Sequence, residues 1–367
     1  MSEASSSLSP QRLVSLDALR GFDMCWILGL GGVVENLSSR FIPGTKLADL
    51  IKTQFDHVEW EGVHFEDLIF PLFLFIAGVS MAIALPKRLE RNGKAKTVRH
   101  LIARAVIIFV VGVIYSGGLS EGWDHIRWLG VLQRIGVASA VAGLLSLALH
   151  TRGLILTTIG LLVGYYLLLT QTNVPGFGKG DFEEGHNLTD YFDKLYLPGR
   201  AYLGLDHDPE GFLSTLPAIA TALLGVLAGK GLQCSASLSK KVLGLILVGA
   251  ALTALGWLWE PYFPVIKKIW SSSFVLVAGG WSAIFLGVFY GIIDGLDWKG
   301  WATPFVWVGA NPIFLYLVSG MGFFHRITTN IVGHPGAGWA WVVSLVTFLL
   351  MLLTARWLYK QRVFIRI

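Results

Sequence analysis

Long stretches of apolar residues recur along this chain of 367 residues and restrict its fold more than any other feature. A helix needs about 20 predominantly apolar residues to cross the hydrocarbon core of a bilayer. Stretches of that kind lie near 14–36, 66–86, 98–118, 128–149, 153–170, 213–232, 241–259, 272–293, 302–321 and 338–358. We therefore predict an all-α, polytopic integral membrane protein with about ten transmembrane helices.

The composition supports this prediction. Hydrophobic residues make up 54% of the chain and charged residues only 14%, whereas about a quarter of the residues of a soluble domain are charged. No linker divides the sequence, so we expect a single domain over 1–367. The two cysteines have no metal-ligand spacing, and we expect no metal site. The net charge of +5 is typical of basic cytoplasmic loops, and we expect no nucleic-acid partner.

Basic residues predict the orientation, because loops rich in Lys and Arg stay in the cytoplasm. They are concentrated in 87–99, after the second predicted span, and recur at Arg152 and in 230–241. With about ten spans, both termini are then cytoplasmic. The long connections 37–65 and 171–212 lie outside and hold half of the 24 acidic residues. We expect functional residues there, and a cytoplasmic (inner) membrane location if the protein is bacterial.

One external segment, FDHVEWEGVHFEDLIF from Phe55, places two histidines and five carboxylates at the start of the second span. A histidine beside a carboxylate can act as a general base or nucleophile, because the carboxylate fixes its tautomer and stabilises its cation. His57 and Asp67 meet if the loop folds onto the helix end. His64, one turn before Asp67, is the competing candidate, and spacing alone does not choose between them. An interfacial helix cap would explain the same residues.

Seven segments resemble, in the same order, the heparan-α-glucosaminide N-acetyltransferase family with its bacterial NagX-like members. They are RLVSLDALRG from Arg12, HVEWEG from His57, DLIFPLFLFIAGVS from Asp67, GVLQRIG from Gly130, DPEGFLSTLPAIATALLG from Asp208, KKIWSSSFVL from Lys267 and PFVWVGANPIFLYL from Pro304. The resemblance implies an enzyme that moves an acetyl group from cytoplasmic acetyl-CoA to an amino sugar or glycan outside. It also implies a catalytic histidine in the first external loop, a position held here by His57, with Asp67 as its partner.

One position departs from the family pattern. Members of known activity carry an asparagine near the outer end of the first helix, where this chain has Gly31 and Gly32. Asn36 lies a little over one turn further on. The resemblance therefore leaves the acceptor open, and we expect Glu59 and Trp60, beside His57, to contact it.

Other polar residues have two interpretations each. Asp208 and Glu210 would bind the acceptor or cap a helix start, and Asn311 would bind substrate or the backbone freed by Pro312. Asp17 and Arg20 are spaced for a helix-surface ion pair, with CoA binding as the alternative. Three further residues are candidates for CoA binding, with topology-setting charge as the alternative: Arg104, Gln133 and Arg134.

The sequence thus predicts a transmembrane acetyltransferase with acetyl-CoA as donor and His57 as base or nucleophile. The alternative is a secondary transporter of a sugar or sugar derivative, since a bundle with buried arginines would also serve transport. Membrane lipid surrounds the protein in either case, and the family resemblance is compatible with a homodimer.

Overall fold

The computed structural model describes residues 13–120, 122–333 and 336–365, and most of these are helical. Seven helices are long and apolar enough to cross a membrane, or up to eight if one bent pair forms a single span. The protein is therefore an all-α, multi-pass membrane protein, as the sequence predicts. The helices are α1 (Val14–Cys25), α2 (Gly31–Phe41), α3 (Lys46–Gln54), α4 (Phe65–Tyr115), α5 (Val131–Ala148), α6 (Thr151–Gln171), α7 (Leu188–Tyr196), α8 (Thr215–Leu232), α9 (Leu238–Trp259), α10 (Ser272–Phe289), α11 (Thr303–Gly309), α12 (Pro312–Gly320), α13 (Phe323–Val332) and α14 (Ala340–Lys360).

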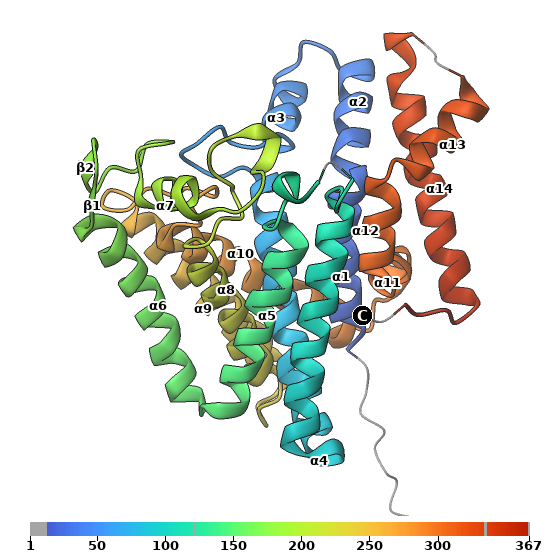
Figure 1. Ribbon diagram of the computed structural model, residues 1–367. Coiled ribbons are helices and arrows are strands. Elements are labelled where there is room, and N and C mark those ends of the chain that lie inside the picture. The colour runs from blue at the N-terminus through green and yellow to red at the C-terminus, as the bar shows by residue number, and fades with distance from the viewer. Residues whose placement is uncertain (1–12, 121, 334–335, 366–367) are drawn as a thin grey trace, which may run out of the picture.

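The first predicted span is interrupted. A π-helical turn, Trp26–Leu30, joins α1 to α2, and Gly29 within it has a φ of 103°. Only glycine adopts this backbone conformation without strain. The two predicted spans 66–86 and 98–118 are the two arms of α4, whose backbone leaves helical geometry at Gly93. In Figure 1 the tip of α4 lies at the bottom, opposite α2 and α3.

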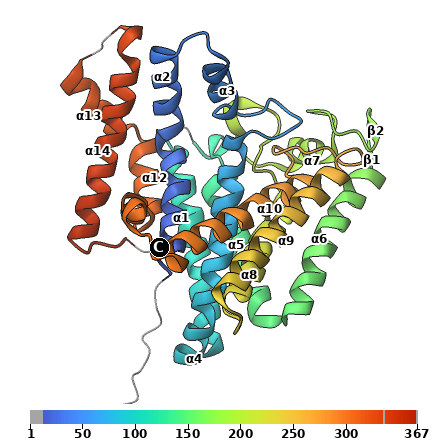
Figure 2. The same ribbon diagram turned by 180° about the vertical axis from the view of Figure 1, so that it is seen from behind.

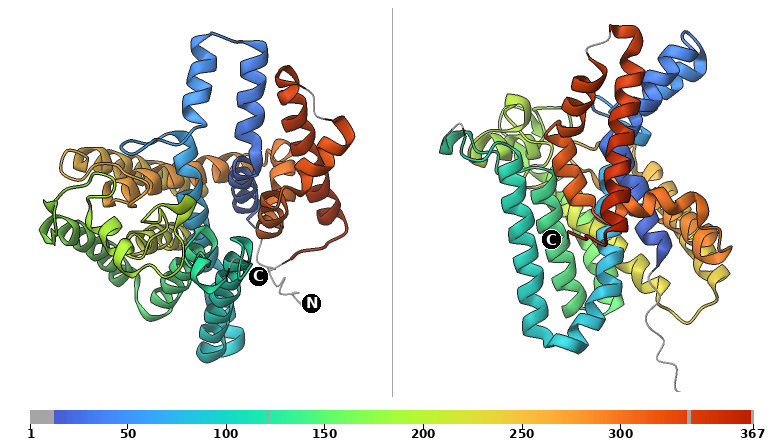
Figure 3. Two further views of the ribbon diagram at one scale, coloured as in Figure 1. Left: turned by 45° about the horizontal axis from the view of Figure 1, so that its top comes forward. Right: turned by 90° about the vertical axis from the view of Figure 1, so that its right-hand side faces the viewer.

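The core is built around α4, which packs against α5 and α8. Seen from behind, α9 and α10 run side by side and obliquely across the bundle (Figure 2). A short hairpin of β1 (Asn173–Val174) and β2 (Gly178–Lys179) lies with α7 at the outer end of α6. The C-terminal helices α13 and α14 form a limb at one side of the bundle (Figure 3).

The predicted span 302–321 is broken rather than continuous. Its halves, Gly300–Gly309 and Pro312–Gly320, are bent by 70°. Pro312 has no N–H to continue the helix, so the break at 310–311 follows from the sequence.

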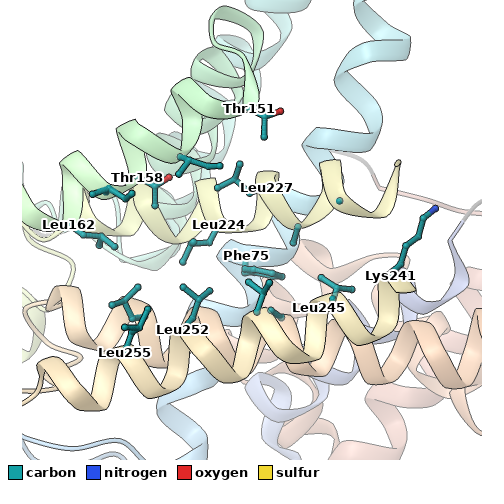
Figure 4. A pocket seen from close by; sticks show the side chains of 18 of the residues that line it. Phe75, Thr151, Thr158, Leu162, Leu224, Leu227, Lys241, Leu245, Leu252 and Leu255 are labelled. Atoms are coloured by element: carbon teal, nitrogen blue, oxygen red, sulfur yellow. The ribbon is translucent and has the colours of Figure 1, made fainter. Parts of the chain in front are cut away.

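An apolar groove of about 750 Å³ lies between α6, α8, α9 and α10. Figure 4 shows Leu162, Leu224 and Leu252 at its walls and Lys241 toward one end. The lining of the groove is almost entirely apolar, with Lys240 and Lys241 as its charged members.

Candidate active site

Asp67 organises the candidate site, although its side chain is only 1% exposed. It lies in the first turn of α4, where unpaired backbone N–H groups favour an anion. Its Oδ2 accepts hydrogen bonds from the backbone N–H of His64 at 3.0 Å and of Val58 at 3.2 Å. These bonds fold the preceding loop onto the helix end. Its Oδ1 is thereby left to face His57.

His57 meets Asp67 as the sequence analysis expects if the loop folds back. Its Nδ1 lies 2.9 Å from Oδ1 of Asp67, and its side chain is 59% exposed. A carboxylate at Nδ1 favours the tautomer with the proton on that nitrogen. The lone pair is then on Nε2, the nitrogen that can take a proton or an acetyl group.

Lys267 completes the group, and sequence reasoning did not identify it as a site residue. Its Nζ donates to Oδ1 of Asp67 at 3.0 Å and lies 3.1 Å from Nδ1 of His57, which is not a hydrogen bond while Nδ1 carries the proton. A β-bridge between Glu61 and Ile266 holds the segment before α10 against the His57 loop. The signal available in the sequence was the KKIWSSSFVL match, which begins at this lysine.

His64, the competing histidine, has a different position. Its Nδ1 lies 2.9 Å from the backbone oxygen of Asp56, and it forms the N-cap of α4. His57 lines the adjacent cavity, and the lining of that cavity does not include His64. The structure therefore places the side chain of His57 against Asp67, whereas the side chain of His64 contacts the backbone of its own loop.

The cavity beside His57 has a volume of about 540 Å³, within the range of small-molecule sites. Its lining combines charged residues with apolar side chains of α4, α5 and α12. The polar lining includes Glu66, Arg127, Glu210, Lys267 and Lys268. The site can therefore take a molecule with a polar end near His57 and an apolar portion between the helices.

Trp60 lines this cavity, whereas Glu59 is exposed on the loop outside it. The indole Nε1 of Trp60 donates to the backbone oxygen of Phe182 at 2.9 Å. The ammonium of Lys268 lies 5.4 Å from the centre of the Trp60 ring. Trp60 therefore connects the His57 loop to the second outer connection, and Glu59 has no comparable position.

Asp208 and Glu210 both bind Arg127, a residue not singled out from the sequence. Arg127 Nη2 lies 2.8 Å from Oδ1 of Asp208 and 2.7 Å from Oε2 of Glu210. Burial opposes the charge of Arg127, but the two carboxylates outweigh burial and raise its pKa. Asp208 also accepts the N–H of Tyr202 at 3.0 Å and is buried, whereas Glu210 lines the cavity.

Gln133 and Arg134 lie close to this ion pair rather than at the tip of α4. Gln133 donates to the backbone oxygen of Arg127 at 3.3 Å. The buried Arg134 donates to the Ser214 hydroxyl, and its guanidinium lies 4.9 Å from the centre of the Trp270 ring. Among the described residues Nε and Nη1 of Arg134 have no hydrogen-bond partner, so the charge of this buried guanidinium is only partly compensated.

Arg104 is separate from Arg134 and lies in the other half of the bundle, on the second arm of α4. Its charge interacts with those of Arg20 and Arg88. Arg20 pairs with Asp17 at 3.2 Å, as the i,i+3 spacing predicts, and donates to Ser80 at 2.7 Å. The three arginines thus form a basic region toward the tip of α4.

Asn311 lies outside the cavity and is fully buried. Its amide donates to the backbone oxygen of Val363 at 3.0 Å and accepts the N–H of Ile365 at 2.7 Å. From the sequence, Asn311 is expected to bind either substrate or the backbone freed by Pro312. Asn311 does bind backbone, but the backbone of the C-terminal segment rather than that of the helix around Pro312. The structure does not bring Asn311 to the other candidate residues.

Asp181, Glu183 and His186 place atoms that could bind a metal within 4.8 Å of one another. They are partly or fully exposed, and His186 is stacked on Phe177 with 4.1 Å between the ring centres. Exposed acidic groups are common without an ion, so the expectation of no metal site stays a prediction.

Comparisons with known proteins identify the family of the chain. The family model described as "Heparan-alpha-glucosaminide N-acetyltransferase, catalytic" matches residues 12–256. Human heparan-alpha-glucosaminide N-acetyltransferase is 32% identical over 324 aligned positions, which cover 72% of this chain and 48% of the human protein. The mouse protein of the same name is 31% identical over 326 positions, with the same two coverages. The chain therefore spans about half the length of these relatives. The match to the family model contains His57 and Asp67 but ends before Lys267.

Proposed function

The chain belongs to the heparan-alpha-glucosaminide N-acetyltransferase family, and from this we propose that it is a transmembrane acetyltransferase that uses acetyl-CoA. The donor would enter from the cytoplasm, and the acceptor would be an amino sugar or a glycan containing one, outside. The observation that carries the proposal is the contact of 2.9 Å between His57 and Asp67 in the wall of the outer cavity.

His57 would perform the transfer through Nε2. Asp67 fixes the ring and stabilises the imidazolium that forms when Nε2 takes a proton. Nε2 either removes a proton from the attacking amine or first accepts the acetyl group and passes it on. Lys267 balances the charge of Asp67, because its ammonium lies 3.0 Å from Oδ1.

The two substrates would reach His57 from opposite sides. The phosphates of CoA are anions, and the basic region of Arg20, Arg88 and Arg104 with the basic stretch 87–99 of α4 is complementary to them. The apolar side chains in the lining of the cavity suit the pantetheine arm. The acceptor would lie against Trp60 and Glu210 at the outer side. A homodimer and a location in a bacterial cytoplasmic membrane are part of the same proposal.

Replacing His57 by Ala tests the proposal. The purified protein should release CoA from acetyl-CoA when glucosamine is added, and His57→Ala should lower this rate by about 100-fold or more. His64→Ala is the matched control, since it removes the neighbouring imidazole and should retain most of the activity. Release of CoA at the wild-type rate by His57→Ala would refute the catalytic assignment.

A transport assay separates the alternative function. Proteoliposomes containing the protein should not take up glucosamine when acyl-CoA is absent. Uptake without acyl-CoA, together with no acceptor-dependent release of CoA, would replace the enzyme by a sugar transporter.

A further inference from the structure

Two buried carboxylates next to the candidate site have no role in the mechanism above. Asp23, in α1, is fully buried, and neither oxygen of its carboxylate has a hydrogen-bond partner in the part of the chain that the structure describes. Oε2 of Glu66, at the start of α4, is also buried and has no partner there.

The two carboxylates are neighbours. Asp23 and Glu66 interact electrostatically, and Glu66 also interacts with His57, Lys267 and Asp67. Glu66 lines the cavity that contains His57, whereas Asp23 lies behind it. The side chains of Asp23 and Glu66 thus continue the cluster of polar residues around His57 into the interior of the bundle.

The departure from the family pattern lies at this place. A Cβ atom at Gly31 would be 3.7 Å from Oε2 of Glu66. An asparagine near this position could offer an amide to that oxygen, but glycine offers nothing. In this chain, therefore, no side chain at position 31 offers a hydrogen bond to that oxygen.

Two adjacent anions without donors are unstable in an apolar interior, because burial of each unpaired charge costs several kcal/mol. The cations nearby are already engaged: Arg20 binds Asp17 and Ser80, and Lys267 binds Asp67. Cys25 is the other titratable group that interacts with Asp23. The simplest state is one in which the fully buried Asp23 carries a proton, which leaves Glu66, in the cavity lining, able to accept one.

We propose that the Asp23–Glu66 pair accepts the proton that the ammonium group of the acceptor must lose before its nitrogen attacks the acetyl group. The inference rests on the proposed acetyltransferase function. An N–H bond of the ammonium breaks, an O–H bond forms on Glu66, and the electron pair stays on nitrogen. Asp23 acts through Glu66 as a positioning residue.

The remaining steps need His57. The nitrogen lone pair forms the bond to the acetyl carbon, the C–S bond breaks, and its electrons go to the sulfur of CoA. The second N–H proton passes through Nε2 of His57 to that sulfur. The lone pair on Nε2 serves this transfer, so the first proton requires a separate acceptor. Of the described carboxylates that line the cavity, Asp67 is paired with Lys267 and Glu210 with Arg127, which leaves Glu66 for this role.

Glu66→Gln removes the proton acceptor and Asp23→Asn removes the neighbouring carboxyl group, each with little change of shape. With glucosamine as acceptor at neutral pH, Glu66→Gln should lower kcat by about 100-fold, with a smaller loss for Asp23→Asn. Activity of both variants should recover as the pH rises, because solvent then removes the ammonium proton. Glu35→Gln, an acidic residue of α2 outside the cavity, is the control and should retain wild-type activity.

A second acceptor distinguishes proton transfer from a structural role. An alkoxyamine derivative of the same sugar is unprotonated at neutral pH, so Glu66→Gln should acetylate it at nearly the wild-type rate. Equal losses with both acceptors, or wild-type rates of both variants with glucosamine, would overturn the inference. An inactive wild-type protein would instead overturn the proposed function and the inference with it. Thermal unfolding of each variant verifies that it is folded.

Discussion

At the scale of single residues, Asp67 connects backbone structure with chemistry. One oxygen binds the N–H groups of Val58 and His64, and the other contacts His57 and Lys267. The same side chain therefore shapes the loop and orients the imidazole. A substitution at this position affects both unless it preserves the shape of the carboxylate.

Asp67→Asn separates the two roles. The amide oxygen can still accept a backbone N–H, but the group loses its charge and no longer stabilises an imidazolium at His57. We expect kcat to fall by about 100-fold or more with a small change in KM for acetyl-CoA. Steady-state kinetics with glucosamine checks this. A kcat close to that of the wild type would show that His57 does not depend on the charge of Asp67.

Arg127 gives a second prediction at this scale. Arg127→Met leaves Asp208, whose side chain is fully buried, without its cation. Breaking a buried ion pair on one side costs about 3–5 kcal/mol, so the midpoint of thermal unfolding should fall clearly. Adding Asp208→Asn should recover part of the loss because it removes the fully buried charge, although Glu210 still lacks its cation. A double variant as unstable as Arg127→Met would contradict this explanation.

The residue-level site was predictable where its contacts are local in the chain. His57 and Asp67 are ten positions apart, and the loop between them is short enough for its residues to indicate the contact. Lys267 is 200 positions from Asp67 and arrives through the bridge between Glu61 and Ile266, so sequence spacing gives no indication of it. Asp208 and Glu210 were recognised as polar candidates, but their partner Arg127 depends on the tertiary fold.

At the scale of elements, glycines set the distance between α4 and α8. A Cβ atom at Gly78 would lie 2.1 Å from the backbone oxygen of Ala222, and one at Gly225 would lie 2.0 Å from that of Phe75. Small residues at such crossings allow close packing of membrane helices. Since α4 carries Asp67 at its outer end, this crossing supports the position of the site.

Gly78→Ala tests the crossing. The added methyl group must separate the two backbones, which should destabilise the protein by about 1–3 kcal/mol. Gly160→Ala in α6 is the matched control, because a Cβ atom there meets nothing within 4 Å. Thermal unfolding in detergent compares the two. Equal unfolding temperatures would mean that α4 and α8 tolerate a wider separation.

The outer connection 171–212 should respond to pH through His207. Burial lowers the pKa of His207, but the nearby carboxylates of Asp190, Asp206 and Glu184 outweigh burial and raise it. The folded protein therefore binds this proton more tightly than the unfolded chain does. The stabilisation is present below the ordinary pKa of histidine and is lost as the pH rises through the raised value.

Limited proteolysis measures this effect. Cleavage within 181–214 should be slower at mildly acidic than at mildly alkaline pH, because local opening is less favourable while His207 is charged. His207→Gln should reduce the difference, and the remainder belongs to Asp193, whose pKa burial raises to about 6. If the pH dependence of cleavage is unchanged in this variant, groups other than His207 cause it.

The length of the apolar stretches predicted where the membrane helices lie, but not where those helices are broken. The spans near 128–149, 153–170 and 241–259 correspond to α5, α6 and α9, because a long apolar run is helical in lipid whatever its neighbours are. The 70° bend between α11 and α12 needs Pro312 together with the tail bound by Asn311. The short helices α3 and α7 lie in polar connections, where no apolar run marks them.

At the scale of the whole molecule, the two ends of the bundle differ in charge. The tip of α4 carries the basic stretch 87–99, and the opposite end carries the acidic connections together with His57 and Lys267. This asymmetry predicts that CoA and the acceptor approach from opposite sides of the membrane. The orientation was inferred from the sequence alone, and it can be measured directly.

Chemical labelling of the native Cys234 can measure the orientation of the protein in the membrane. It is exposed in the short loop between α8 and α9, whereas the other cysteine, Cys25, is buried. A membrane-impermeant maleimide should therefore label Cys234 in inside-out vesicles and not in right-side-out vesicles, and Cys234→Ser should abolish labelling. Leu203→Cys in the Cys234→Ser background should give the reverse pattern, because Leu203 is 82% exposed in the connection on the side of His57. Labelling of Cys234 in right-side-out vesicles would invert the topology and bring the candidate site to the cytoplasmic side, where a transmembrane transfer would no longer be needed.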